Sequence, residues 1–258
     1  MANTFLTTAY ISGGVTGYYE PSINSDYTTG LWKTCPILAI MQDPSLGTIW
    51  MDDFRIVKDE DGTENFYDIA GDTPLFNYTD GANGQAVIEP TNTTDNHAST
   101  IYTLSESWLI EANKELWFEA RVKLTEQNTD DANILVGLTD SAGADVCQDN
   151  GGGPPASHDG IVWAKVDGGT VWQFEVSNAA AQTTTADAGD FTSGSWHRLG
   201  FHFDGDTTAT PYLDGVAGNG LTLTLASLDE MELCMSVKNG GANKETLYLD
   251  YVKVVQIR

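Results

Sequence analysis

Basic residues are scarce in this sequence. Its 258 residues include 12 Lys and Arg against 37 Asp and Glu, which gives a formal net charge of −25. A field of that sign repels the phosphate backbone of nucleic acids and the surface of anionic membranes. We therefore expect no nucleic acid and no membrane among the partners of this protein, and the acidity itself favours solubility.

Cysteine is also scarce. The three cysteines, Cys35, Cys147 and Cys234, are odd in number and far apart, so they predict neither a disulfide framework nor a zinc knuckle. The first ten residues lack the basic and apolar regions of a secretory signal peptide. No apolar run is long enough for a membrane-spanning helix. We expect a chain that folds in a reducing cytoplasm with its thiols reduced, and Cys234 in a buried strand.

Helical periodicity is almost missing. The one helix candidate is Ser105–Lys114, which could also be a turn. Elsewhere, short runs of β-branched and aromatic residues alternate with Gly, Asp and Asn clusters, a pattern typical of an antiparallel all-β sandwich. The predicted strands are Thr48–Val57, Gln85–Glu89, Ser99–Leu104, Leu116–Thr125, Asn133–Thr139, Gly160–Val166, Thr170–Ser177, Trp196–Phe203, Thr210–Leu213, Leu221–Leu225, Glu232–Lys238 and Thr246–Ile257.

The strand Leu116–Thr125 shows the clearest alternation. Its apolar residues at 116, 118, 120, 122 and 124 share the face that we expect in the core, and its polar residues share the other face. Asp167-Gly168 predicts a tight hairpin between the strands on either side of it.

The first 45 residues differ from the rest of the chain. They are rich in Gly, Ser, Thr and Tyr and contain little charge. We predict two parts, an N-terminal arm or docking segment over residues 1–45 and a β-sandwich over residues 46–258. The alternative is that the arm simply adds edge strands to the sandwich. The long loop Ser141–Asp159 has the length of a functional or mobile excursion.

Two stretches resemble laminin G-like and pentraxin-like lectins. They are Gly194–Phe201, which contains Trp196-His197, and Tyr212–Val216, which contains Asp214-Gly215. The resemblance implies that Trp196 seals the core, that His197 points outward and that Tyr212 packs inward. Asp214 and Gly215 would then form the turn after the strand.

Three further stretches resemble family-16 glycoside hydrolases. Leu116–Leu124 is similar to their Phe-Glu-Ala-Arg-x-Lys strand, Leu249–Gln256 to their closing strand, and Trp50–Phe54 to the strand that pairs with it. These likenesses span residues 48–258 and imply a concanavalin A-like jelly roll.

The hydrolase activity does not follow from the resemblance. Those enzymes use a Glu-x-Asp-x-Glu strand whose carboxylates share one face, and this sequence has no such run. The nearest stretch is Asp229–Glu232, which we interpret as a solvated sheet edge. We predict a protein that is not an enzyme, and an atypical hydrolase that uses Glu230 and Glu232 remains the rival.

Two groups of side chains are candidate ligand contacts. Trp163, Trp172 and Tyr212 could stack on sugar rings if exposed, although aromatic residues in strands are more often core. Asp140, Asp145 and Asp149 could bind calcium, as loops of jelly-roll lectins often do, although a plain hydrophilic loop is the alternative. No cofactor is required, and the four histidines, His97, His158, His197 and His202, have no metal-ligand spacing.

A lectin-type sandwich without an export signal suggests release by cell lysis. The sequence resembles, in general style, the concanavalin A-like capsid decoration proteins of tailed bacteriophages. This resemblance implies a virion protein made in the host cytoplasm and displayed on the capsid exterior. Its partners would be the major capsid protein or another virion protein, further copies in a homotrimer, and cell-surface glycans. A pure lectin is the second rival.

Overall fold

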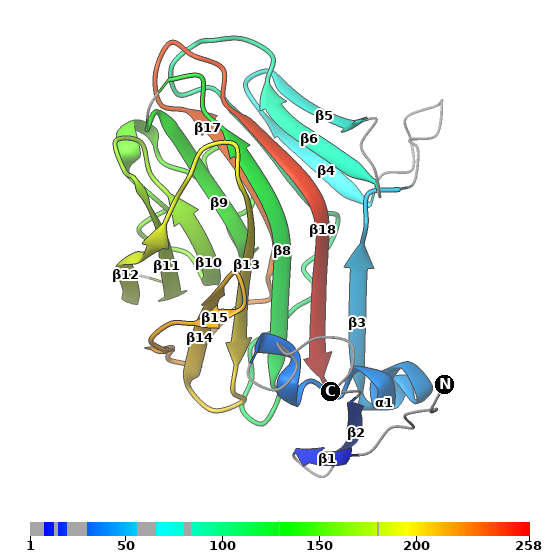
Figure 1. The fold of residues 1–258 in the computed structure, drawn as a ribbon. Coiled ribbons are helices and arrows are strands. Elements are labelled where there is room, and N and C mark those ends of the chain that lie inside the picture. The colour runs from blue at the N-terminus through cyan, green and yellow to red at the C-terminus, as the bar shows by residue number, and fades with distance from the viewer. Residues whose placement is uncertain are drawn as a thin grey trace.

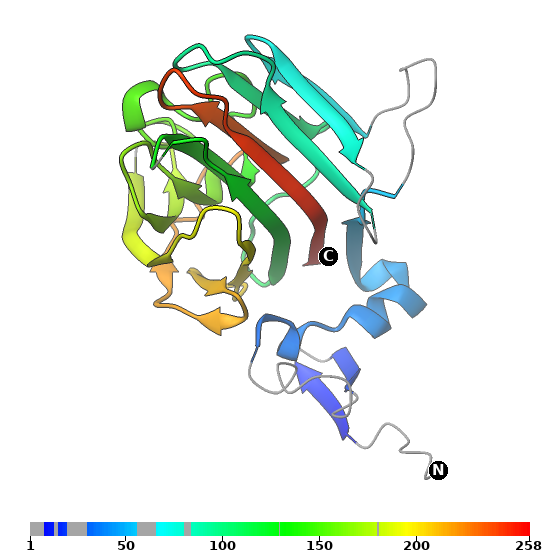
Figure 2. The same cartoon turned by 45° about the horizontal axis from the view of Figure 1, so that its top comes forward.

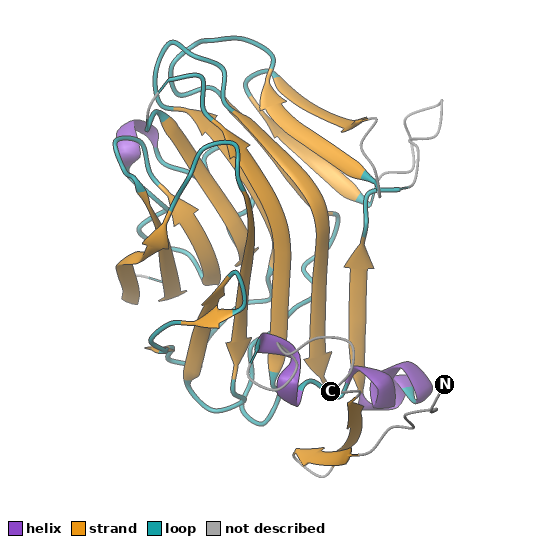
Figure 3. Ribbon diagram, viewed as in Figure 1, coloured by secondary structure: helices purple, strands orange, loops and turns teal. Residues whose placement is uncertain are grey.

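A computed structural model describes residues 8–12, 15–19, 30–55, 66–79, 84–128, 130–179 and 181–258. Two antiparallel sheets stack on one another as a sandwich (Figures 1 and 3). The predicted all-β jelly roll is confirmed. The described residues include no helix that is long and apolar enough to span a membrane. The acidic run Asp59–Glu64, which resembles the start of a calcium loop, lies outside the described residues.

The first sheet has seven strands, and every neighbouring pair is antiparallel. In spatial order the strands are β12 (Ala181–Asp190), β11 (Val171–Asn178), β10 (Gly160–Lys165), β9 (Ala132–Thr139), β17 (Glu232–Asn239), β7 (Ala98–Thr103) and β4 (Tyr67–Gly71).

The second sheet has nine strands. Its main path runs through β15 (Val216–Ala217), β14 (Thr208–Leu213), β13 (Trp196–Phe203), β8 (Leu116–Thr125), β18 (Thr246–Ile257), β6 (Gln85–Pro90) and β5 (Pro74–Thr79). Two more strands join beside this path: β16 (Leu221–Thr222) pairs with β14, and β3 (Gly47–Asp52) pairs with β18.

One large apolar core fills the space between the sheets. The five alternate residues of β8 that begin at Leu116 are fully buried in it, as the alternation predicts. The pairing of β3 with β18 confirms the expected contact between the opening and closing strands. The Asp167-Gly168 turn joins β10 to β11, which pair as the predicted hairpin.

Part of the N-terminal region lies against the outer face of the nine-stranded sheet. Two 3₁₀ turns, η2 (Leu31–Thr34) and η3 (Pro44–Leu46), flank the short helix α1 (Ile37–Gln42). Leu31 and Ile40 are buried there against Trp117 and Val255. A separate hairpin of β1 (Thr8–Ser12) and β2 (Val15–Tyr19) lies below the sandwich, beyond the ends of the long strands (Figure 2).

Several expectations from sequence are wrong in detail. Ser105–Lys114 contains no helix, because Trp108 instead forms a bridge to Met231 and its side chain is buried in the core. Six strands, β1, β2, β4, β5, β12 and β15, were not predicted. β12 reads Ala-Gln-Thr-Thr-Thr-Ala-Asp-Ala-Gly-Asp, and a mostly exposed edge strand needs no apolar alternation.

The lectin-like segment also points differently from its expected orientation. Trp196 lies on the outer face, where the guanidinium of Arg121 is 4.6 Å from its ring. His197 points inward, and its ring is 5.7 Å from that of Trp172. Tyr212 packs outside the core, with the residues that cover Trp117. The pleat alternation of β13 is therefore one residue out of phase with the expected one, because Leu199, Phe201 and Phe203 fill the core.

Candidate functional site

A groove of about 480 Å³ opens at one side of the sandwich, between the edges of the two sheets. One wall is β12 and the other is formed by β14, β15 and the residues after them, which lie at the lower left of Figure 1. Trp163 of β10 lines its floor, where its Nε1 donates a hydrogen bond to the Gly200 carbonyl at 3.0 Å. Such a volume, with an apolar floor, lies in the range of small-ligand sites.

A β-bulge shapes the first wall of the groove. Trp172 pairs with Gly189 and Phe174 with Thr185, so three residues of β12 face the single residue Gln173 of β11. Bulges redirect side chains beside binding sites. Here the bulge brings Asp187 to the rim of the groove.

The turn after β14 shapes the second wall. Asp214 adopts a φ of 52° and Gly215 one of 85°, which makes the tight turn that the sequence predicts. The Asp214 carboxylate accepts a hydrogen bond from the backbone N–H of Arg198 at 2.7 Å and lies 3.0 Å from Nδ1 of His197. Asp214 is therefore occupied in holding the turn.

Three polar side chains of the groove remain available to a ligand. Thr185, Asp187 and Asn219 line it, and their side chains make no hydrogen bond within the described part of the chain. Together they offer a hydroxyl, a carboxylate and an amide above an apolar floor. Saccharides combine hydroxyl groups with apolar C–H faces, so this arrangement suits a sugar ring.

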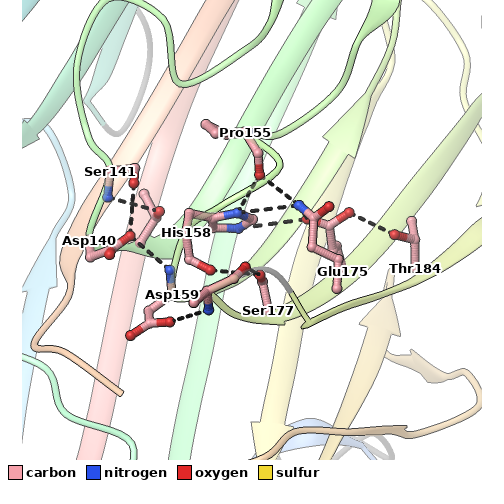
Figure 4. A network of polar contacts seen from close by, with 11 residues as sticks. Asp140, Ser141, Pro155, His158, Asp159, Glu175, Ser177 and Thr184 are labelled. Atoms are coloured by element: carbon pink, nitrogen blue, oxygen red, sulfur yellow. Dashed lines mark hydrogen bonds and ion pairs between the residues drawn. The ribbon is translucent and has the colours of Figure 1, made fainter. Parts of the chain in front are cut away.

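A polar network around the buried side chains of His158 and Glu175 holds β12 in place (Figure 4). Glu175 of β11 accepts hydrogen bonds from Thr184 Oγ1 at 2.6 Å and from Gln182 Nε2 at 3.1 Å. His158 Nε2 lies 3.6 Å from the same carboxylate, while His158 Nδ1 lies 2.8 Å from the Pro155 carbonyl. The network joins the loop before β10 to the outer face of β11 and β12, and so fixes one wall of the groove.

The loop Ser141–Asp159 covers the outer face of the seven-stranded sheet. Val146 and Cys147 are buried against Leu135, Val162 and Cys234. The ammonium group of Lys238, whose side chain is 1% exposed, binds Asp149 at 2.7 Å and Asp145 at 3.5 Å. Burial raises the pKa of the Cys147 thiol to about 12, so this thiol stays protonated.

Three carboxylates meet at the end of this loop. One ligand atom from each of Asp140, Asp159 and Asp229 lies within 4.8 Å of the others. Both Asp159 oxygens already accept backbone N–H groups, from Ala179 at 2.6 Å and from Asp229 at 2.7 Å. The two other predicted calcium ligands, Asp145 and Asp149, are turned to Lys238 and do not join Asp140. Three oxygens are fewer than the six to eight that calcium takes, so the cluster makes at most a partial site.

A second acidic group lies on the seven-stranded sheet. Burial, with the charges of Glu106 and Asp68, raises the pKa of Glu232. Tyr102, which lies between β17 and β4 in the sheet, donates a hydrogen bond to Asp68 at 3.1 Å. Glu232 is thus half-buried and electrostatically perturbed, which differs from the solvated edge that we expected.

The predicted sugar-contact residues do not meet in one place. Trp163 lines the groove but is only 1% exposed, Trp172 is fully buried in the core, and Tyr212 lies on the outer face of the other sheet. Sequence reasoning missed Thr185, Asp187 and Asn219. The Gly-rich and Asp-rich turns around them were visible, but no sequence signal shows that a bulge brings them together.

The sequence matches no protein-family model and no curated protein. Solved structures do resemble the fold. Lectin II from Ulex europaeus has a TM-score of 0.56 at 11% identity, over 81% of this chain and 98% of the lectin. Peanut lectin gives 0.54 at 12% identity, over 81% and 97%. The endo-1,3-beta-glucanase from Streptomyces sioyaensis gives 0.55 at 14% identity, over 80% and 95%. The chain therefore has the concanavalin A-like jelly-roll fold of lectins and family-16 glucanases.

Proposed function

We propose that this protein is a non-catalytic carbohydrate-binding protein that holds a sugar in the groove between β12 and β14–β15. The observation behind the proposal is the groove itself, with Trp163 at its floor and three unengaged polar side chains, Thr185, Asp187 and Asn219, at its rim. Lectins with the same fold support the proposal, but the groove residues are its basis.

Alanine at Asp187 tests the groove directly. A glycan array and then calorimetry with the best neutral oligosaccharide should show at least about a tenfold loss of affinity in Asp187→Ala, equivalent to one lost hydrogen bond to a charged group. Asp190→Ala is the matched control, because Asp190 is exposed on the same strand but does not line the groove. Equal binding by both variants would contradict the proposal.

We further propose that the protein is displayed on the exterior of a virion, where its N-terminal arm contacts the major capsid protein or another virion protein. The β1–β2 hairpin lies beyond the body of the sandwich, which suits an anchoring role (Figure 2). A homotrimer would match a threefold position on a shell. The protein would be made in the host cytoplasm.

A truncation tests the arm. Deletion of residues 1–29 removes the hairpin but keeps Leu31 and Ile40, which are buried in the body. We expect the truncated protein to fold and to lose binding to particles. Mass spectrometry of purified particles shows whether the full-length chain is present, and full particle binding by the truncated chain would refute the arm.

Glycoside hydrolysis is the second candidate function, and Glu232 supports it. A carboxyl group whose pKa is raised by burial and by neighbouring carboxylates is what a general acid requires. Reducing-sugar release from β-glucans, abolished in Glu232→Gln but not in Glu230→Gln, would establish this activity. No release by the unmodified protein would exclude β-glucanase activity.

A further inference from the structure

Cations and aromatic rings lie side by side on the outer face of the nine-stranded sheet. This is unusual in a chain with 12 basic residues and a net charge of −25. Beside the area that η2 and α1 cover, three neighbouring strands carry six half-buried side chains that are either cationic or aromatic. We call this surface the cation–aromatic face: Trp196 and Arg198 of β13, Arg121 and Lys123 of β8, and Tyr248 and Tyr251 of β18.

Strand register places these side chains in two rows. Lys123 lies opposite Trp196 on one side and Tyr248 on the other. Arg121 lies opposite Arg198 and Tyr251 in the same way. Directly opposite residues of neighbouring strands are close enough for their side chains to touch. The two rows therefore form one continuous surface.

Lys123 is the group on this surface with unused binding capacity. Its ammonium nitrogen lies 4.2 Å from the centre of the Tyr248 ring and 5.0 Å from that of Trp196. It makes no hydrogen bond or ion pair with any residue that the structure describes. Two rings thus hold the cation, and its three N–H donors remain available to an anion.

The same surface already binds carboxylates of its own chain. The guanidinium of Arg121 forms an ion pair with Asp250. The Tyr251 hydroxyl donates a hydrogen bond to Glu119 at 2.7 Å. These contacts show the chemistry that the face recognises, and Lys123 is the position where such a carboxylate partner is missing.

We propose that the cation–aromatic face binds a carboxylated polysaccharide, with a uronate carboxylate at Lys123 and a sugar ring against Trp196 or Tyr248. The charge of Lys123, which no carboxylate of the described residues offsets, selects an acidic group, and the aromatic rings select a saccharide rather than a peptide. This site is separate from the groove, which lies at the edge between the sheets and has no cation among the residues that line it.

Polygalacturonate binding by the full chain tests the proposal. We expect affinity electrophoresis to show retention that falls at least tenfold in Lys123→Met, which keeps the side-chain stem but removes the charge. Lys114→Met is the matched control, because Lys114 pairs with Glu111 away from this face, and its retention should be unchanged. Circular dichroism of both variants checks that they fold.

The possible results separate the two sites. Lys123-dependent retention on polygalacturonate, with or without binding of neutral glycans in the groove, supports the cation–aromatic face even if the groove proposal fails. No retention of the unmodified protein, or equal loss in the Lys114 and Lys123 variants, overturns it. Stronger Lys123-dependent retention on dextran sulfate than on polygalacturonate overturns the choice of a carboxylate.

Discussion

Leu135 and Lys123 both point away from the core, on the outer faces of opposite sheets, yet their surroundings differ completely. Leu135 lies under the loop Ser141–Asp159 and is fully buried. Lys123 is only half-buried, because η2 and α1 cover the other end of β8, around Trp117, and not the end that carries Lys123. The alternation within a strand determines which side chains point away from the core. The segments that cover the outer face of each sheet determine whether those side chains are buried or exposed to solvent.

The largest expected difference in stability is between an aspartate introduced on the outer face of the seven-stranded sheet and one introduced on the outer face of the nine-stranded sheet. Leu135→Asp should lower the free energy of unfolding by about 4 kcal/mol or more, because it buries a carboxylate without a partner. Met51→Asp, on the outer face of the other sheet and 58% exposed, should change it by less than about 0.5 kcal/mol. Urea unfolding measures both, and equal effects would show that the loop does not cover Leu135 in solution.

A pH titration addresses the region where the two sheets meet. Burial and the charge of Glu126 raise the pKa of Glu245, at the start of β18, to about 7. The folded state then binds more protons than the unfolded state between about pH 4.5 and 7, so stability falls as pH rises through this window and is flat above it. We expect a loss of about 3 kcal/mol.

Glu245→Gln isolates this effect from the general repulsion of an acidic chain. Its unfolding free energy should fall less steeply between those pH values than that of the unmodified protein, because only the contribution of Glu245 is removed. An identical pH dependence in the two proteins would mean that Glu245 keeps its ordinary pKa.

A matched pair of lysines compares the two faces with the same chemical change. Lys238→Met should cost about 2 kcal/mol, since Lys238 is buried and holds the covering loop through Asp149. Lys123→Met should cost less than about 0.5 kcal/mol, because Lys123 is half exposed. Thermal unfolding compares the two, and a larger cost at Lys123 would reverse the comparison.

Thiol labelling compares how often the two covering segments, the N-terminal segment and the loop Ser141–Asp159, open to solvent. Burial raises the pKa of Cys35, in the N-terminal segment, and that of Cys147, in the loop Ser141–Asp159, each to about 12. Both should react slowly with a thiol reagent at pH 8. Cys35 should react first, since it is half-buried whereas Cys147 is buried. Faster labelling of Cys147 would identify the loop as the looser cover.

The smallest effect concerns the acidic cluster at the end of the loop. Asp229→Asn should change the melting temperature by no more than about 2 °C, because Asp229 is exposed and its backbone contact to Asp159 remains. Calcium should leave the melting temperature of both proteins unchanged. A calcium-dependent rise that Asp229→Asn removes would show that the cluster is a metal site.

The sequence predicted best where a side chain's environment depends on its own strand. The alternation in β8 located the core face, and the Asp167-Gly168 turn located a hairpin. It predicted poorly where environment depends on other segments. Trp196 and His197 exchanged their expected sides, and the exposed strand β12 left no apolar pattern. Trp163 does line the groove, but it is almost fully buried and does not present an exposed ring on which a sugar could stack.

By itself, the sequence determined the strong acidity, the all-β jelly roll and the pairing of strands joined by a tight turn, such as β10 with β11. Periodicity and turn chemistry act between residues that are near neighbours in the chain. Only the tertiary structure decided which carboxylates meet, which lysines are buried and where a groove opens. Those outcomes depend on segments far apart in the chain, such as those that bring Lys238 to Asp149 and those that place Thr185 and Asn219 in one groove. Alternation within one strand does not specify them.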